Sequence, residues 1–229
     1  MYTVSPFLSF ARWFVTLPTS LMLRSMNSSE YDAIDIGANH GLFTILMSKT
    51  APGGKVYSFE PEKHSYNKLI NNVSNIPNVK TFNIALGDEE KEVELYFNLD
   101  NDGGHALWDP AVHPDNSKTK SHDRIKQIVQ MKTLDSIIDI KPKVIKIDTE
   151  GCELLIIKGA KNLIEKYKPI IITEINYIGL TEMGTSPVEF QKYMESIGYR
   201  CYSLPERQDL DLSIMKRSWV INVLFKPVD

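Results

Sequence analysis

The chain of 229 residues has only two cysteines, Cys152 and Cys201, and its formal net charge is only -3. Two isolated cysteines in a chain of this length form no disulfide framework, so a reducing compartment, the cytoplasm, is expected. The small net charge gives no sign of an electrostatic surface for nucleic acid. With 42% hydrophobic and 24% charged residues, the composition is typical of a globular protein with one large domain.

Residues 4–23 are rich in apolar side chains but lack the marks of a signal peptide or a transmembrane helix. No Lys or Arg precedes Arg12, whereas a signal peptide normally has a basic region ahead of its apolar core. Arg12 lies inside the apolar run and Pro18 interrupts it, which argues against a transmembrane helix. The i, i+3, i+4, i+7 spacing predicts an amphipathic helix. We therefore expect residues 1–30 to be a helical extension that packs on the domain or on a second subunit of a homodimer, with membrane contact as the alternative.

The stretch YDAIDIGANHG, residues 31–41, predicts a buried strand, a tight turn and the start of a helix. Gly37 and Gly41 let a ligand approach the backbone, where a Cβ would block it. The helix end offers free N–H groups to an anionic part of that ligand. Asp35 ends the strand, where it can meet a cationic or donor group. A ligand with both an ammonium and a carboxylate would suit this loop.

Strands and helices alternate up to residue 88 and again from residue 143, which predicts parallel β-α-β units. The expected strands of this alternation are 31–36, 55–60, 79–86, 144–148 and 169–174. The expected helices are 42–50, 62–74, 152–167 and 187–197. We therefore predict an α/β fold with a doubly wound, mostly parallel sheet, in a single domain over residues 31–229.

Two further features complete this expected domain. Residues of about 89–132 form a β-rich insertion after the third strand, with too little apolar content for a core of its own. Long irregular segments of this kind often form lids or binding loops. The last two strands, 199–204 and 219–225, have no obvious helix between them, so we expect them to pair antiparallel.

Four expected strands end in an acid, namely Asp35, Glu60, Asp148 and Glu174. Ligands of open α/β sheets bind at the carboxyl ends of the strands, so these acids should line one edge. Glu60 lies 23 residues after Gly37, where a carboxylate can accept hydrogen bonds from both ribose hydroxyls. The ligand is therefore expected to be a nucleoside-containing cofactor.

Two cofactor classes compete for this site. A dinucleotide would need G-x-G-x-x-G to admit its pyrophosphate, but three residues separate Gly37 from Gly41. S-adenosylmethionine has no phosphate, and its amino-acid head suits Asp35 and the helix end. The two trailing strands also favour a methyltransferase sheet. A nicotinamide-dependent oxidoreductase, or a non-catalytic binding module of the same architecture, stays as an alternative.

Six stretches between residues 30 and 175 match the motifs of one family in order and spacing. They are DIGANHG (35–41), FEP (59–61), NIALGD (83–88), TLDSI (133–137), IKIDTEGCE (145–153) and the strand that ends at Glu174. The chain thereby resembles the FkbM-type S-adenosylmethionine-dependent methyltransferases. The resemblance implies a class I methyltransferase (Rossmann-like) fold and O-methylation of a hydroxyl on a small molecule or sugar.

The resemblance also implies which residues hold the cofactor. The methionine end would be held by Asp35, Gly37, Asn39 and Gly41, and the ribose by Glu60. Asn83, Ala85 and Leu86 would lie near the adenine. Many methyltransferases have an acid where this chain has Ala85, so the contact to the adenine amine would fall to the backbone or to a neighbouring side chain.

Asp148, Glu150 and Glu174 are the candidates for the reacting edge, since a carboxylate near the acceptor can orient or deprotonate its hydroxyl. Glu150 could instead be a first-turn acid that favours the following helix, and Asp148 a partner of a nearby N–H. Lys146 is on the same face of its strand as Asp148 and could neutralise it. Asp148 and Glu174 could also hold Mg²⁺, but the resemblance does not require it, and no metal is predicted.

The insertion contains His105, His113 and His122 among Asp102, Asp109, Asp115 and Asp123, at spacings that match no metal motif. In the family this region approaches the cofactor from above, so His105 and Trp108 could touch the substrate, with His105 as a candidate general base. Asp148-Thr149-Glu150-Gly151 differs from the Asn/Asp-Pro-Pro-aromatic run of enzymes that methylate nucleic-acid bases. A small-molecule or carbohydrate acceptor is therefore expected, and nucleic acid is not.

Overall fold

The computed structural model describes residues 30–203, 208–217 and 219–228 of the chain. The amphipathic helix expected over residues 4–23 lies outside this part. Eight of the described strands form one large sheet and three form a small one. The large sheet contains β1 (Asp32–Ile36), β2 (Val56–Phe59), β3 (Val79–Phe82), β7 (Pro142–Ile147), β8 (Ile170–Asn176), β9 (Tyr199–Ser203), β10 (Gln208–Asp209) and β11 (Val220–Pro227). The small sheet contains β4 (Ala85–Leu86), β5 (Lys91–Tyr96) and β6 (Lys126–Lys132).

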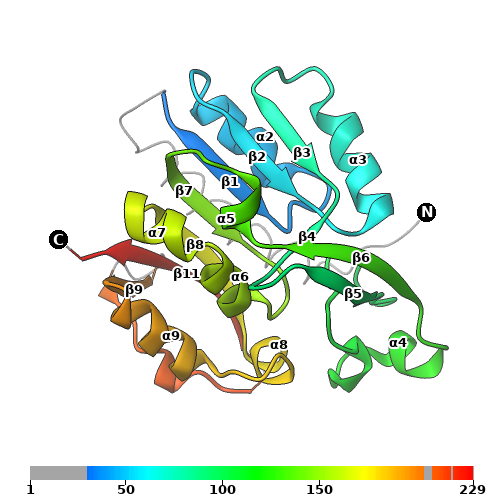
Figure 1. Cartoon of the computed structure of the whole chain (residues 1–229). Coiled ribbons are helices and arrows are strands. Elements are labelled where there is room, and N and C mark those ends of the chain that lie inside the picture. Colours follow the sequence, from blue (N-terminus) through cyan, green and yellow to red (C-terminus); the bar gives the residue numbers. More distant parts are fainter. Residues whose placement is uncertain (1–29, 204–207, 218, 229) are drawn as a thin grey trace.

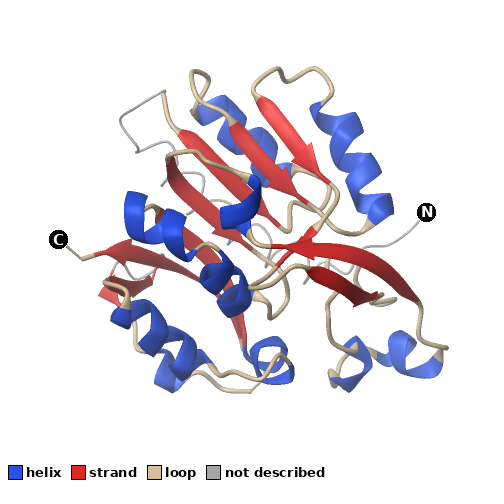
Figure 2. Cartoon of the chain, in the orientation of Figure 1, coloured by secondary structure: helices blue, strands red, loops and turns tan. Residues whose placement is uncertain are grey.

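The order of strands in the large sheet is β10-β9-β11-β8-β7-β1-β2-β3 (Figures 1 and 2). The five strands from β8 to β3 run parallel to one another, and β11 pairs antiparallel with both β8 and β9. The expected doubly wound, mostly parallel sheet with an antiparallel C-terminal strand is confirmed. Because the parallel strands end at one edge, the loops that follow β1, β2, β7 and β8 lie there together.

Helices pack on both faces of the large sheet, because the side chains of each strand alternate between the two faces. The described helices are α2 (Leu42–Thr50), α3 (Lys63–Val73), α4 (Ser117–Ser121), α5 (Leu134–Ile137), α6 (Glu153–Gly159), α7 (Lys161–Tyr167), α8 (Tyr177–Glu182) and α9 (Pro187–Ser196), with 3-10 turns η1 (Pro110–Val112) and η2 (Leu212–Ile214). Ile34 and Ile145 belong to a core cluster with α6, α7 and α9. Ala33 and Val144 face the other way, in a cluster with Met47 of α2.

The single strand expected over residues 79–86 is two strands in different sheets. β3 pairs with β2 in the large sheet, whereas β4 pairs with β6 in the small one. Asn83 lies at the break, and its side-chain amide donates to the backbone carbonyls of Glu60 and Pro61 at 2.8 and 3.0 Å. These bonds hold the chain where it leaves the large sheet.

The helix expected over residues 152–167 is also broken, into α6 and α7. A Cβ on Gly159 would lie 1.8 Å from the carbonyl oxygen of Gly87, so the end of α6 approaches the β4 turn more closely than a side chain allows. The Asp135 carboxylate accepts the N–H groups of Asn162 and Leu163 at 2.9 and 3.0 Å. Asp135 therefore satisfies N–H groups that have no partner within the first turn of the new helix, α7.

The insertion consists of the β5–β6 hairpin with α4 and η1 between its strands. Its buried residues Leu95, Val129 and Met131 pack on Ala85 of β4. Tyr96 also forms an isolated bridge with Ala106, which directs the following residues back towards the large sheet. No helix among the described residues is long and apolar enough to cross a membrane.

Candidate active site

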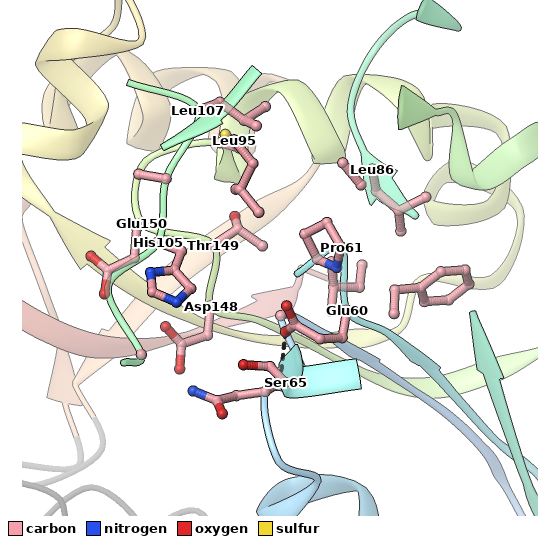
Figure 3. A pocket seen from close by; sticks show the side chains of 18 of the residues that line it. Glu60, Pro61, Ser65, Leu86, Leu95, His105, Leu107, Asp148, Thr149 and Glu150 are labelled. Carbon is pink, nitrogen blue, oxygen red and sulfur yellow. Dashed lines mark hydrogen bonds between the residues drawn. The ribbon is translucent and has the colours of Figure 1, made fainter. Parts of the chain in front are cut away.

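A cavity lies at the carboxyl ends of the central parallel strands, where the loops after β1, β2 and β7 meet β4 and the insertion. In Figure 3, Asp148, Glu150 and His105 lie on one side of this cavity, and Glu60, Pro61 and Leu86 on the other. Carboxyl groups therefore stand on both sides, and apolar residues from β2, β4 and the insertion separate them.

Gly37 and Gly41 have the backbone conformation that glycine favours, with φ of +73° and +89°. A Cβ on Gly37 would lie 1.8 Å from the carbonyl oxygen of Asp148, so the loop after β1 touches the loop after β7 through bare backbone. Asn39, between the glycines, also has a positive φ of +49°. Gly37 and Asn39 of this turned backbone line the cavity wall.

Glu60 connects this loop to the end of β2. Its two carboxylate oxygens accept the N–H groups of Asn39 and Glu62 at 2.8 and 2.9 Å. Burial raises the pKa of Glu60 to about 7, although these two hydrogen bonds act in the opposite direction. Each oxygen keeps a lone pair for a ligand hydroxyl.

Asp35 does not line the cavity. Its side chain is fully buried, with 0% exposed. The Thr44 hydroxyl donates to its Oδ2 at 2.6 Å, and Lys146 Nζ lies 3.6 Å from its Oδ1. Any effect of Asp35 on a bound ligand therefore passes through these neighbours.

Lys146 is a buried cation between the two loops. Its Nζ lies 3.2 Å from the Asp148 carboxylate and 3.5 Å from the Gly37 carbonyl oxygen. Burial alone would lower the pKa of Lys146, but the carboxylates of Asp148 and Asp35 more than offset this, so its pKa is raised. The expected proximity of Lys146 to Asp148 is confirmed.

Asp148, Glu150 and Glu174 form an acid cluster at the ends of β7 and β8. One carboxylate oxygen from each of the three residues can be chosen so that all three oxygens lie within 4.8 Å of one another. Burial raises the pKa of Glu150 to about 8, and the neighbouring Asp148 adds to this. Burial, then Asp148 and Glu150, also raise the pKa of Glu174 well above its usual value. Glu150 and Glu174 therefore titrate as coupled groups, because the loss of one proton makes loss of the other less favourable.

The loop between Asp148 and α6 is held by Glu153, whose side chain is fully buried. Glu153 Oε1 accepts three hydrogen bonds, from the N–H groups of Thr149 and Gly151 and from the Thr149 hydroxyl, all at 3.1 Å. Burial raises the pKa of Glu153 to about 6. Sequence reasoning missed this role, although an acid at the first position of a helix is its usual signal.

His105 lies on the cavity wall and belongs to the insertion. The backbone N–H of Asn98 donates to its Nδ1 at 3.1 Å, so the neutral ring carries its proton on Nε2. Burial lowers the pKa of His105, although Glu62 and Asp102 act against this. The ring is therefore neutral at pH 7, with an N–H available to a ligand.

The residues predicted to hold the cofactor divide into two groups. Those that line the cavity are Gly37, Asn39, Glu60, Ala85 and Leu86. Those that stand behind its wall are Asp35, Gly41 and Asn83. Among the predicted reacting residues, Asp148, Glu150 and His105 line the cavity, and Glu174 joins them through the acid cluster. Their chemical roles stay predictions.

The family model described as the methyltransferase FkbM domain matches residues 35–201, which is most of the chain. The chain belongs to the FkbM methyltransferase family. It therefore contains a methyltransferase domain of a family that uses S-adenosylmethionine as methyl donor. The oxidoreductase alternative is set aside by this membership.

Two curated relatives of this FkbM protein are methyltransferases. Hexuronic acid methyltransferase AglP of Haloferax volcanii is 23% identical over 142 residues, which cover 60% of this chain and 53% of AglP. Methyltransferase sdnD of Sordaria araneosa is 28% identical over 152 residues, covering 55% of this chain and 59% of sdnD. The chain thus spans little more than half the length of these curated relatives.

Solved structures share the fold of this FkbM domain at low identity. The FkbM methyltransferase of Methylobacillus flagellatus KT has a TM-score of 0.53 at 20% identity, over 87% of this chain and 44% of that one. A Streptococcus mutans protein in complex with SAH has a TM-score of 0.54 at 13% identity, over 92% and 96% of the two chains. The class I methyltransferase fold, with its Rossmann-like sheet, is thereby confirmed.

The cavity of the FkbM domain fits a donor with an amino-acid head and a ribose. The Asn39 Oδ1 atom is buried and has no hydrogen-bond partner among the described residues, so it is free to accept one from a ligand. The neighbouring Glu60, which accepts the Asn39 N–H, offers further lone pairs for hydroxyl groups. The close contact at Gly37 keeps the cavity floor free of a side chain. These residues would hold S-adenosylmethionine.

Proposed function

We propose that this FkbM methyltransferase methylates a hydroxyl group of a small molecule or a sugar. The observation that carries the proposal is the acid cluster Asp148, Glu150 and Glu174, which lies across the cavity from Glu60. A base beside the donor site is what a hydroxyl acceptor requires, because its oxygen must lose a proton as it is methylated. The relation to a hexuronic acid methyltransferase supports a sugar acceptor.

S-adenosylmethionine, when bound, supplies a methyl group made electrophilic by its positive sulfur. The acceptor hydroxyl oxygen would bond to that methyl carbon as the carbon–sulfur bond breaks, with the electron pair of the broken bond left on the sulfur. In our proposal the hydroxyl proton passes to the carboxylate of Glu150. The raised pKa of Glu150, about 8, suits this task, because a general base works best when its pKa is near the working pH.

Asp148 and Glu174 would orient the acceptor by accepting hydrogen bonds from its neighbouring hydroxyls. Lys146 Nζ lies 3.2 Å from the Asp148 carboxylate and holds it beside the loop after β1. Fixed acceptors of this kind align the reacting oxygen, which contributes to the rate by reducing the entropy lost in the transition state.

His105 would donate a hydrogen bond to the acceptor rather than remove its proton. Its Nδ1 already accepts the N–H of Asn98, so the group left for a ligand is Nε2–H. That group suits a carbonyl, a ring oxygen or a carboxylate such as that of a hexuronic acid. This proposal changes the expected role of His105 from base to donor.

The test is incubation with isotope-labelled S-adenosylmethionine and a panel of hexuronic acids, hexuronate glycosides and neutral sugars. We expect a methyl ether on a hydroxyl, located by NMR of the product, and loss of transfer in Glu150→Gln. Glu182→Gln, at an exposed position of α8, is the matched control. Transfer to nitrogen or carbon instead, or undiminished transfer by Glu150→Gln, would contradict the proposal.

Two further expectations accompany this function. The described cysteines Cys152 and Cys201 are both buried and free, which supports a reducing compartment such as the cytoplasm. We also keep the homodimer as a proposal, since it rests on the apolar pattern of residues 4–23, outside the part that the structure describes.

A further inference from the structure

Glu150 has a backbone conformation that non-glycine residues rarely adopt. Its φ is +57°, in the left-handed region, where the Cβ of an L-residue crowds the backbone. Such strain persists only where the surroundings hold it, and it is concentrated at functional sites.

The peptide group between Glu150 and Gly151 is bound at both ends. Its carbonyl oxygen accepts the indole Nε1–H of Trp108 at 2.5 Å, across 42 positions of sequence. Its N–H donates to the Glu153 carboxylate at 3.1 Å. Rotation of this peptide would break both bonds at once, so the pair prevents Glu150 from relaxing.

Neighbouring backbone closes the space around the same peptide. A Cβ on Gly151 would lie 2.4 Å from the backbone of Gly179 in α8, and a Cβ on Gly179 would lie 2.6 Å from the Glu150 carbonyl oxygen. The indole ring of Trp108 packs on Ile178 of the same helix. The insertion and α8 therefore enclose the loop that carries Glu150.

Asn176 holds the side chain of Glu150. Its amide Nδ2 donates to Glu150 Oε2 at 2.8 Å, while its Oδ1 accepts the N–H of Gly179 at 3.0 Å. The last residue of β8 thus caps α8 and fixes the Glu150 carboxyl with one side chain. The carboxyl is thereby held beside those of Asp148 and Glu174.

We propose that Trp108 and Asn176 are positioning residues that clamp Glu150 in its strained conformation, so that the insertion determines where the base stands. The inference rests on the proposed function, in which Glu150 takes the proton of the acceptor. It assigns the insertion a task beyond covering the cavity, because Trp108 holds the backbone of the base. Asn176, at the end of β8, holds its carboxyl.

The test compares Trp108→Phe with Trp219→Phe in the full chain. Phenylalanine keeps a ring against Ile178 but has no N–H donor, and Trp219 is a partly exposed residue outside the site. Two NMR measurements are made, amide hydrogen exchange at Gly151 and the carboxyl ¹³C titration of Glu150, which is assigned with Glu150→Gln. Binding of SAH is measured by calorimetry as the check on the donor site.

In Trp108→Phe we expect exchange at Gly151 to be about tenfold faster, the size of one lost hydrogen bond. The titration of Glu150 should move down by about one pH unit as its carboxyl gains solvent. Trp219→Phe should change neither, and SAH affinity should stay within about twofold of wild type in both variants.

The proposal would be overturned if exchange at Gly151 were unchanged, or if it were faster while the titration of Glu150 stayed the same. The hydrogen bond from Trp108 to the Glu150 carbonyl would then have only a structural role. If Trp108→Phe does not fold, Asn176→Asp replaces it, since aspartate keeps the oxygen that caps Gly179 but cannot donate to Glu150. The titration of Glu150 should then move up, and no change would overturn the proposal. None of these measurements needs an acceptor, so failure of the clamp and failure of O-methylation are distinguishable.

Discussion

Replacing Glu150 with glutamine should make the protein more stable at high pH, although the substitution removes the proposed base. Glutamine has the same shape and can still accept the amide hydrogen of Asn176. It carries no charge, so it removes the cost of ionising a carboxyl beside Asp148 and Glu174. The comparison therefore isolates the charge of Glu150 from its packing.

The size of the effect follows from the shift in pKa. The Glu150 carboxyl has an ordinary pKa of 4.5 when the chain is unfolded and a pKa of about 8 in the fold. Between these values the folded chain keeps a proton that the unfolded chain has lost, so wild-type stability falls as the pH rises from 4.5 to about 8. The full shift corresponds to about 5 kcal/mol. Partial contact with solvent and proton sharing with Glu174 reduce this to about 2 kcal/mol.

Urea unfolding at pH 5, 7 and 9 measures the difference. At pH 5 we expect Glu150→Gln to lie within about 0.5 kcal/mol of wild type, and at pH 9 to be more stable by about 2 kcal/mol. The exposed Glu182→Gln serves as control and should show no trend with pH. A stability difference that is the same at all three pH values would refute the reasoning, because Glu150 would then ionise alike in both states.

Three further predictions concern the donor site and the acid cluster. Glu60→Gln should weaken SAH binding in calorimetry by about tenfold, since one of the two oxygens that receive ligand hydroxyls is lost; equal affinity would exclude Glu60 from the site. Gly37→Ala should destabilise the fold by at least about 3 kcal/mol in urea unfolding, whereas Gly184→Ala, with a similar positive φ but open space, should cost only about 1 kcal/mol. Dialysis against EDTA should leave methyl transfer unchanged, and a loss restored by Mg²⁺ would indicate a cation at the acid cluster.

The parts of the fold that depend on local pattern could be predicted from the sequence. Strand–helix alternation and the acids at strand ends identified the sheet and its functional edge, because buried strands and glycine turns have strong local signals. The break at Asn83 and the break between α6 and α7 were missed, since both arise from contacts with distant backbone. The short helix α8 was missed for a related reason, as its cap, Asn176, also binds Glu150.

The candidate site was predictable in its membership but not in its geometry. Residue spacing placed Lys146 beside Asp148, because the two alternate onto one face of a strand. Spacing could not show that Trp108 reaches Glu150, which requires the insertion to fold back across the sheet edge. Nor could residue spacing show that Asp35 is buried behind Lys146, since the position of Lys146 depends on how the neighbouring strand β7 pairs with β1.

Lys146 makes the donor loop and the acid cluster one electrostatic unit. Lys146 in β7 is the register partner of Asp35 in β1. The pairing of these adjacent strands therefore puts a cation opposite the acid that precedes the loop after β1, which lines the donor site. The Lys146 ammonium group also reaches Asp148, at the start of the acceptor side. A change of charge on either side therefore alters the field felt by the other, as buried charges are only weakly screened. Loss of activity in a variant at Asp35, Lys146 or Asp148 would consequently not identify its role. The affinity for SAH reports on the donor side, and the titration of Glu150 reports on the acceptor side. A residue can be assigned to a single side when its substitution changes one of these two measurements and leaves the other unchanged.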